Sequence, residues 1–471
     1  MSVLTTAPPA SRPPGAWRRP LSYLLFTVLP AITAFLLVRP TSGGGGAGRP
    51  PGPSTPVPPV DVILPGVLLG IAVVVVVSQL VGALAVRLRQ PRVFGEIIAG
   101  ILLGPTVLGA VSPGVSLFTP SMMPLVDALA QLGVLFFMFR VGRELPMSLL
   151  RGHGTTAVVV GHAGIAVPFL AGVLLALGPL AALRPAGASV TAFVMMSGIA
   201  LSVTAFPVLA RILEERSLRD TRIGALGMAV AGITDVSAWC LLALVMATVR
   251  GTSPGGVVRT VLLTAVFAAL MWWVVRPLLQ RLTPVLAGRA RGSAAIVVVL
   301  LLLVLLCAAI TDAIGISPIF GAFIAGLVVP RGEPWGECAV RLDGSANWLL
   351  PLFFADVGFK TDLWSLQLGA GWLTVLAVVA TATAGKLLGV VLPARMAGLD
   401  TRSAFAVGSM MNCRGLTEII VLQLGLSAGV ISQPLFTVLL VMTLVTTAMT
   451  GPLLGMVLPG RTADTLLPGH R

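Results

Sequence analysis

The chain has 471 residues, of which 56% are hydrophobic and 10% are charged, and its formal net charge is +14. Its mean hydropathy is +1.00, and much of the apolar sequence lies in blocks close to the bilayer-spanning length of about 20 residues. This composition excludes a soluble globular domain and indicates a polytopic helical membrane protein. The positive charge does not indicate nucleic-acid binding, because the basic residues lie in loops between apolar blocks, where membrane orientation requires them.

The first 59 residues form a separate N-terminal segment. An apolar block at 21–38 follows Arg18 and Arg19, as in a signal peptide, but no small-x-small cleavage site follows closely. We therefore predict an extra N-terminal helix and keep cleavage open as the alternative. The next residues, 39–59, are rich in glycine and proline and predict a linker that cannot build a packed core.

Residues 60–458 are almost continuous membrane sequence, followed by a short tail at 459–471. The predicted spans are 60–86, 93–108, 122–141, 155–177, 189–213, 224–249, 257–279, 293–313, 318–329, 348–359, 371–392, 403–426 and 435–458. They make thirteen transmembrane helices, or fourteen with the N-terminal block. If every block crosses, most of the 31 Lys and Arg residues fall in the loops on one side. We therefore expect both termini in the cytoplasm, provided that the N-terminal helix is retained.

One carboxylate, Asp235, lies in the middle of the apolar run at 224–249. An ionisable side chain at the bilayer centre costs about 2.5 to 3.5 kcal/mol on insertion scales, so it is a functional candidate by default. The alternative is an aspartate held in a structural helix contact. We favour function, because an apolar residue at this position would avoid the cost altogether.

Two predicted spans contain residues that a continuous lipid-facing helix avoids. The run LSVTAFP at 201–207 places a serine and a threonine before a proline, which removes a backbone donor. The run MNCRGLTE at 411–418 concentrates polar and charged residues around a glycine. Both predict broken helices inside protein or beside a cavity. They lie in the fifth and twelfth of the thirteen spans, an odd offset that predicts an inverted-topology repeat. Two ordinary kinked helices are the alternative.

Several motifs together resemble a known transporter family. The similarity is carried by QPRVFGEIIAGILLGP at 90–105, ALSVTAFPVLARILE at 200–214, and the segments 234–241, 311–330, 351–362 and 411–425. In this order they resemble the monovalent cation:proton antiporters, specifically the branch of Kef-type systems and plant cation/proton exchangers. The resemblance implies a sodium/proton-antiporter-like fold over 60–458, in which a six-helix core domain moves against a dimerisation bundle. It also implies a homodimer in the cell membrane.

The resemblance transfers to individual residues where the motif is present. Asp235 falls on the family's ion-binding aspartate, and Thr234 falls on the preceding position, which is a carboxylate in many electrogenic exchangers. Lys386 falls on the basic residue that pairs with that preceding carboxylate, so its usual partner is missing here. Three alternatives stay open: Lys386 bonds Thr234, interacts with Asp235, or is deprotonated.

We expect the Asp235 carboxylate to bind either a dehydrated alkali cation or a proton, so that each ligand expels the other. The hydroxyl groups of Ser202, Thr204 and Thr234, with nearby carbonyl groups, are expected to complete an oxygen shell around the transported metal cation. With one aspartate in place of a pair, electroneutral one-for-one exchange is expected. The residue types do not decide between potassium and sodium, although the branch favours potassium.

The second helix break contains three polar residues with a structural interpretation. Arg414 is expected to neutralise helix-dipole ends or Glu418 where the broken helices cross, in a region that also contains Asn412. Direct ion handling by Arg414 is the alternative. Arg140 and Arg143 stand where the family usually has apolar residues, and the sequence offers no functional account of them.

Carboxylates near span ends, such as Asp356, are expected to be hydrated or to cap helices. Trp335, Trp348 and Trp364 fit a belt at the membrane interface, and Trp239 fits packing rather than chemistry.

No cofactor is expected, and the chain is not predicted to be an enzyme, because no nucleophile with a base and no histidine cluster stands out. The expected partners are a monovalent cation, protons, the lipid bilayer and a second copy of the chain. An attached nucleotide-binding regulatory domain is not expected after residue 458. The main alternative function is proton-coupled export of a small organic cation or natural product, and a non-transporting membrane sensor or scaffold is a further one.

Overall fold

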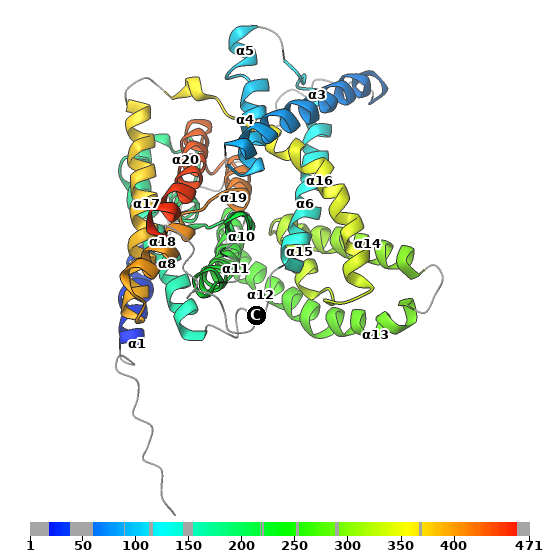
Figure 1. Ribbon diagram of the computed structural model, residues 1–471. Helices are drawn as coiled ribbons and strands as arrows, with labels where there is room; N and C mark the ends of the chain where they lie inside the picture. The colour runs from blue at the N-terminus through cyan, green and yellow to red at the C-terminus, as the bar shows by residue number, and fades with distance from the viewer. Residues whose placement is uncertain are drawn as a thin grey trace, which may run out of the picture.

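The computed structural model describes residues 18–37, 60–88, 90–112, 116–144, 154–216, 218, 221–250, 254–287, 292–366 and 370–458. Throughout these residues the regular structure is helical (Figure 1), which confirms the predicted all-α fold class. The predicted linker at 39–59 and the tail at 459–471 lie outside the described residues.

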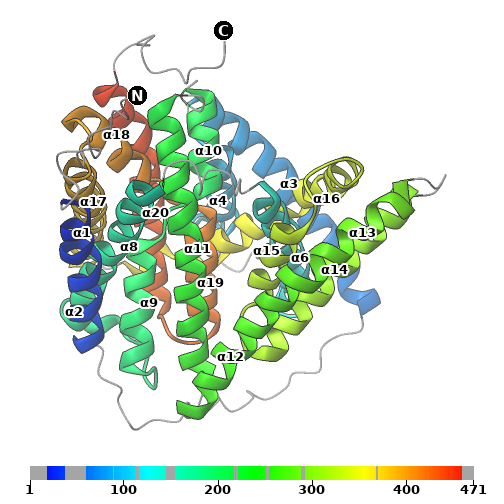
Figure 2. The ribbon, with the colours of Figure 1, turned by 90° about the horizontal axis from the view of Figure 1, so that it is seen from below.

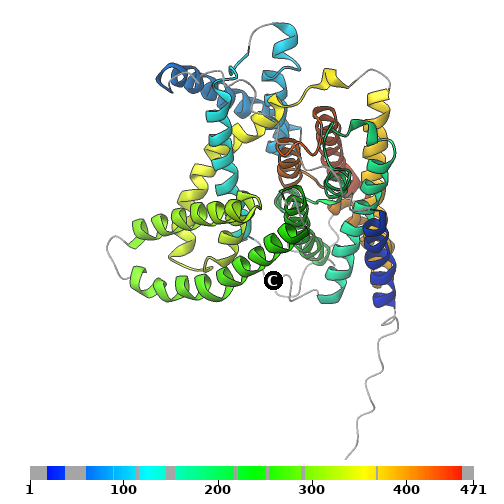
Figure 3. The same ribbon diagram turned by 180° about the vertical axis from the view of Figure 1, so that it is seen from behind.

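The long helices form two groups that lie side by side (Figures 1 and 3). The first, which we call the bundle group, contains α3 (Val60–Arg87), α4 (Arg92–Leu103), α6 (Met123–Glu144), α14 (Gly292–Ile314), α15 (Pro318–Val328) and α16 (Trp335–Phe359). The second, which we call the crossing group, contains α8 (Gly154–Leu177), α9 (Val190–Ser202), α10 (Phe206–Glu215), α11 (Arg222–Arg250), α17 (Ala370–Met396), α18 (Thr401–Met411), α19 (Leu416–Ser427) and α20 (Gln433–Val457).

The two groups are joined by a nearly continuous helix. It consists of α12 (Pro254–Leu270), a π-helical turn at Met271–Val275 and α13 (Arg276–Ala287), and it leads from α11 to α14. Short elements lie in the loops: α5 (Leu108–Val111) and two 3₁₀ turns at Ala181–Leu183 and Leu363–Ser365.

Within the described residues, nine helices are long and apolar enough to cross a membrane. Shorter apolar helices lie at Leu21–Ala34, Val190–Ser202, Pro318–Val328 and Thr417–Ser427. These elements confirm a multi-pass membrane protein, while the count of thirteen or fourteen spans stays a prediction. The span predicted at 348–359 is too short, because α16 already begins at Trp335. Charged residues ended the apolar run there, but such residues continue a helix without difficulty.

The N-terminal block is helical, as predicted. It forms α1 (Arg18–Tyr23), a π-helical turn at Leu24–Val28 and α2 (Leu29–Leu37), and it packs on α8 and α17 of the crossing group (Figure 2). The hydroxyl of Tyr23 lies 3.2 Å from Nδ1 of His162 on α8, and the two rings meet edge to face. This helix therefore adds a layer to the outer face of the crossing group.

Small residues let α6 and α15 approach closely in the bundle group. Gly142 on α6 faces Gly326 on α15, and neither position has room for a Cβ atom, because it would overlap with the backbone of the opposite helix. Close packing through small residues is a usual way for membrane helices to associate. It fixes α15 against α6 and so holds Phe323 of α15 beside the crossing group.

Candidate ion-binding site

Both predicted helix breaks are present. α9 ends at Ser202 and α10 begins at Phe206, with extended backbone between them. The break lies just before Pro207, because a proline has no N–H and its ring clashes with the preceding helical turn. α18 ends at Met411, and α19 begins after Gly415, whose φ of +156° is accessible to glycine but rarely to other residues.

The two breaks lie against each other and exchange hydrogen bonds. The backbone N–H of Ala205 donates to the carbonyl of Cys413 at 3.1 Å, and the hydroxyl of Thr204 donates to the carbonyl of Met411 at 3.1 Å. The side-chain amide of Asn412 donates to the carbonyl of Thr446 in α20 at 3.4 Å. The first break therefore donates to two carbonyls of the second that would otherwise lack a partner, which makes unwound backbone tolerable at membrane depth.

Arg414 binds the C-terminal end of α9 across the crossing. Its fully buried guanidinium donates to the carbonyls of Ala200 and Leu201 at 2.8 and 2.6 Å, and it lies 3.3 Å from the carboxylate of Glu418. The C-terminal carbonyls of a helix carry partial negative charge, which a cation stabilises. Both parts of the structural interpretation are therefore present: Arg414 neutralises a helix end and Glu418.

Lys386 on α17 also holds the end of α9. Its buried ammonium donates to the carbonyl of Gly164 at 3.0 Å, to the carbonyl of Ser202, and to the hydroxyl of Thr204 at 2.7 Å. An ammonium has three donors, and these three oxygens use all of them. Neither Thr234 nor Asp235 is among these partners, so the bond to Thr234 considered from the sequence is not formed.

Asp235 lies in the middle of α11 and is only 1% exposed. Within the described residues, neither of its carboxylate oxygens has a hydrogen-bond partner. The hydroxyl of Thr417, in the first turn of α19, interacts with this carboxylate but does not reach normal hydrogen-bonding geometry. The sequence prediction did not single out Thr417, although its place in the run 411–418 was a usable signal. The arrangement leaves a buried carboxylate whose oxygens are not used by hydrogen bonds to the described residues.

The other predicted ligands have hydrogen bonds of their own. The hydroxyls of Thr234 and Ser202 donate to carbonyls of their own helices at 2.8 and 2.9 Å. The hydroxyl of Thr204 accepts a hydrogen bond from Lys386. These oxygens keep lone pairs for a cation, but none is hydrogen-bonded to Asp235 here. Their place in an oxygen shell stays a prediction.

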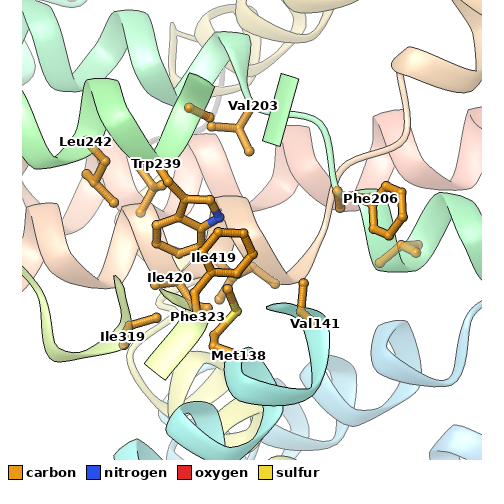
Figure 4. Close-up of a cluster of buried hydrophobic side chains, with 14 of the residues drawn as sticks. Met138, Val141, Val203, Phe206, Trp239, Leu242, Ile319, Phe323, Ile419 and Ile420 are labelled. Carbon is orange, nitrogen blue, oxygen red and sulfur yellow. The ribbon is translucent and has the colours of Figure 1, made fainter. Parts of the chain in front are cut away.

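An apolar cluster lies between α11, which carries Asp235, and helices α6 and α15 of the bundle group (Figure 4). Trp239 on α11 stacks on Phe323 of α15, with ring centroids 6.1 Å apart and an interplanar angle of 24°. Side chains of α6, α9, α10, α15 and α19 surround the pair, among them Met138, Val141, Val203, Phe206, Ile319, Ile419 and Ile420. The packing role predicted for Trp239 matches this contact.

Charged and amide side chains connect the two groups at one end of their interface. The ammonium of Lys360 lies 3.0 Å from Asp127 of α6 and 2.7 Å from Asp356 of α16. From the crossing group, Gln423 donates to Asp356 at 2.9 Å, and Gln433 donates to the carbonyl of Lys360. We call these five residues the polar bridge. Asp356 is 3% exposed, and its side chain forms an ion pair with Lys360 and accepts from Gln423, so neither the hydrated nor the helix-capping carboxylate expected from the sequence describes it.

Two of the three tryptophans predicted to form an interfacial belt are exposed, and one is buried. Trp348 and Trp364 are 69% and 73% exposed. Trp335 is buried, and its indole donates to the hydroxyl of Thr283 on α13 at 2.8 Å. The difference arises because Trp335 lies at the first turn of α16, where α13 covers it.

Arg140 and Arg143 lie near the C-terminal end of α6. Arg140 forms an ion pair with Glu144 at 2.7 Å, and the Arg143 guanidinium lies 5.7 Å from the ring centroid of Phe139. Both of these contacts are local, because they join residues one turn apart on α6.

Comparison with known proteins agrees with this geometry. The family model described as "Sodium/hydrogen exchanger, transmembrane" matches residues 72–459. The Na⁺/H⁺ antiporter NhaS4 of Synechocystis is 38% identical over 398 residues, which cover 83% of this chain and 97% of that protein. The K⁺/H⁺ antiporter 1 of Saccharomyces cerevisiae is 36% identical over 393 residues, covering 80% of this chain and 44% of that protein.

Cation/H⁺ antiporter 19 of Arabidopsis thaliana is 36% identical over 403 residues, covering 85% of this chain and 50% of that protein. The chain therefore spans about half the length of these plant and yeast relatives. Among solved structures, the sodium proton antiporter MjNhaP1 from Methanocaldococcus jannaschii matches with a TM-score of 0.58 and 16% identity, covering 84% of this chain and 98% of that chain. This match confirms the predicted sodium/proton-antiporter-like fold. The family model and the sequence identities together show that the chain belongs to the sodium/hydrogen exchanger family.

Proposed function

We propose that this chain exchanges a monovalent alkali cation for a proton, and that Asp235 binds the two in competition. One observation carries the proposal: the Asp235 carboxylate is 1% exposed and has no hydrogen-bond partner among the described residues. A buried carboxylate without a partner is unfavourable unless a ligand neutralises it. A proton and a small cation are the ligands that a single carboxylate binds, and only one of them fits at a time.

The names of the relatives support a cation and protons as the transported pair. NhaS4 is named a Na⁺/H⁺ antiporter and the yeast relative a K⁺/H⁺ antiporter, so their names leave sodium and potassium both open. Thr417 extends the proposed site beyond Thr234, Ser202 and Thr204, because its hydroxyl faces the carboxylate from α19. A hydroxyl oxygen is a suitable ligand for an alkali cation.

Alternating access requires two parts that move against each other. We propose that the crossing group, which carries Asp235, moves against the bundle group, and that the bundle group forms the contact of a homodimer. The apolar cluster around Trp239 and the polar bridge lie between the two groups and would change with this motion. We place the protein in the cell membrane with both termini in the cytoplasm, since most basic residues lie on one side.

The test measures proton flux in proteoliposomes that contain a trapped pH dye. Potassium, sodium, lithium and choline are added in turn to wild type, to Asp235→Asn and to a matched control, Asp312→Asn, which removes an exposed carboxylate on α14. We expect alkali-cation-dependent flux in wild type and control and none in Asp235→Asn. The same rate under a clamped membrane potential would support one-for-one exchange.

Flux that persists in Asp235→Asn would contradict the single-site proposal. Flux driven by an organic cation such as choline, but by no alkali cation, would favour export of an organic substrate instead.

A further inference from the structure

Three polar atoms on one stretch of α11 are buried without a hydrogen-bond partner in the part of the chain that the structure describes. Two are the carboxylate oxygens of Asp235, which only accept when ionised, and the third is Nε1 of Trp239, which only donates. Both side chains are 1% exposed. A buried donor without an acceptor is unfavourable, and a phenylalanine would provide a similar ring without it. The donor is therefore a feature that packing alone does not explain.

Helix geometry places the two side chains as neighbours. Asp235 and Trp239 are four residues apart, so they lie on the same face of α11, one turn from each other. Side chains on a helix lean toward its N-terminus, so the indole extends over the turn that carries Asp235. The carboxylate and the indole N–H are therefore neighbours on α11, although they are not hydrogen-bonded to each other in this structure.

Phe323 of the bundle group holds the indole in its present orientation. The two rings are stacked at 6.1 Å, and Phe323 is fixed because α15 packs tightly on α6. The stack therefore joins the crossing group to the bundle group next to the ion site. Movement of one group along the other would separate the rings and free the indole.

We propose that Trp239 is a positioning residue for ion exchange: its indole N–H hydrogen-bonds the Asp235 carboxylate when no cation is bound and the stack on Phe323 is open. The inference rests on the proposed function of Asp235. The indole has no lone pair with which to bind a cation, so it must withdraw when the cation arrives. Thr417 differs in this respect, because its hydroxyl oxygen can bind the cation itself.

The proposal has a defined kinetic consequence. A donor that stabilises the cation-free carboxylate weakens cation binding and speeds cation release. In Trp239→Phe the ring remains but the donor is lost, so we expect a lower KM for the cation together with a lower maximal rate. Hydrogen bonds to charged groups have net strengths that correspond to a KM roughly 10- to 150-fold lower.

The experiment measures initial rates of cation-driven proton flux against cation concentration in proteoliposomes. Trp239→Phe is compared with wild type and with Phe323→Leu, which removes the stacking partner and keeps the indole N–H. We expect the lower KM in Trp239→Phe but not in Phe323→Leu. A merely structural role would lower the maximal rate of both variants and leave KM unchanged, and that result would overturn the proposal.

A second readout covers variants that bind but do not transport. The rise in melting temperature of the purified protein on adding potassium or sodium reports cation binding directly. We expect a larger rise at a given concentration in Trp239→Phe than in wild type, and an equal or smaller rise would overturn the proposal. Asp235→Asn separates the two claims. If this variant keeps cation-dependent flux, the proposed function fails. If it has no flux while Trp239→Phe keeps the wild-type KM and the wild-type rise in melting temperature, only the role of Trp239 is contradicted.

Discussion

Replacing Arg414 with methionine removes the cation that holds the end of α9 and keeps a side chain of similar length. The guanidinium donates to the carbonyls of Ala200 and Leu201 and lies 3.3 Å from Glu418, and both charged side chains are fully buried. The substitution leaves one carboxylate buried without its counter-charge and two helix-end carbonyls without their donor. We therefore expect a large loss of stability.

The magnitude follows from these contacts. Breaking a buried ion pair on one side costs about 3 to 5 kcal/mol, and each buried carbonyl left without a donor adds about 1 to 3 kcal/mol. Arg414→Met should therefore destabilise the folded protein by about 5 kcal/mol or more. Glu418→Gln should cost less, about 1 to 3 kcal/mol, because Arg414 keeps its two carbonyl partners. The double variant Arg414→Met with Glu418→Met removes both charges, so it should be less destabilised than Arg414→Met alone.

The assay is thermal unfolding of the detergent-solubilised protein, followed by the fraction that remains monodisperse on size exclusion. We expect the melting temperature to be lowest in Arg414→Met, intermediate in the double variant and highest in Glu418→Gln. Arg414→Lys is a further control, because lysine keeps the charge but lacks the planar fork that reaches two carbonyls and a carboxylate at once. An Arg414→Met protein that melts at the same temperature as wild type would refute this reasoning. A double variant that melts at a lower temperature than Arg414→Met would refute it as well.

Two further predictions concern the surface between the groups and a helix cap. Gln423→Leu removes the hydrogen bond from the crossing group to Asp356. We therefore expect faster deuterium uptake at Leu363–Ser365 in hydrogen–deuterium exchange mass spectrometry. Unchanged uptake would contradict the role of Gln423 in connecting the two groups. Asp400 caps α18 by accepting from the N–H of Ser403 at 3.0 Å, and Asp400→Ala should cost about 1 kcal/mol. Hydrogen bonds from Ser403 hold the pKa of the Asp400 carboxyl below its ordinary value of 3.8. A lowered pKa stabilises the fold above pH 3.8, and this contribution disappears as the pH falls through the lower folded-state value. The difference in melting temperature between Asp400→Ala and wild type should therefore be present at neutral pH and vanish in acid, and a difference that persists in acid would argue against the cap.

The sequence was sufficient to predict the breaks but not their partners. A proline at 207 and a glycine at 415 act on their own backbone, so local rules locate both interruptions. The partners of Lys386 are Gly164, Ser202 and Thr204, which lie far away in sequence. Two of these contacts are to backbone carbonyls, which every residue has, so the residue types could not predict them. The same reason explains the error at Asp356. Its position near a span end suggested water, whereas its actual partners are Lys360 at the end of its own helix and Gln423 of α19.

The placement of fixed charges bears on how many charges move in one cycle. The ammonium of Lys386 and the guanidinium of Arg414 are held by carbonyls of α9, and Glu418 is held by Arg414. All of these partners lie within the crossing group, so under the proposed motion we expect the three groups to keep them. Asp235 is different, because its carboxylate has no hydrogen-bond partner among the described residues, so under the proposed mechanism its ligand alone changes between the two directions of the cycle. Exchange of one cation for one proton at one carboxylate transfers no net charge, so the rate should not depend on a clamped membrane potential. A transport rate that did depend on the membrane potential would require a second group to gain or lose a proton. Lys386 would be the first residue to substitute in that case, because its side chain contacts Thr204 at the crossing of the two broken helices.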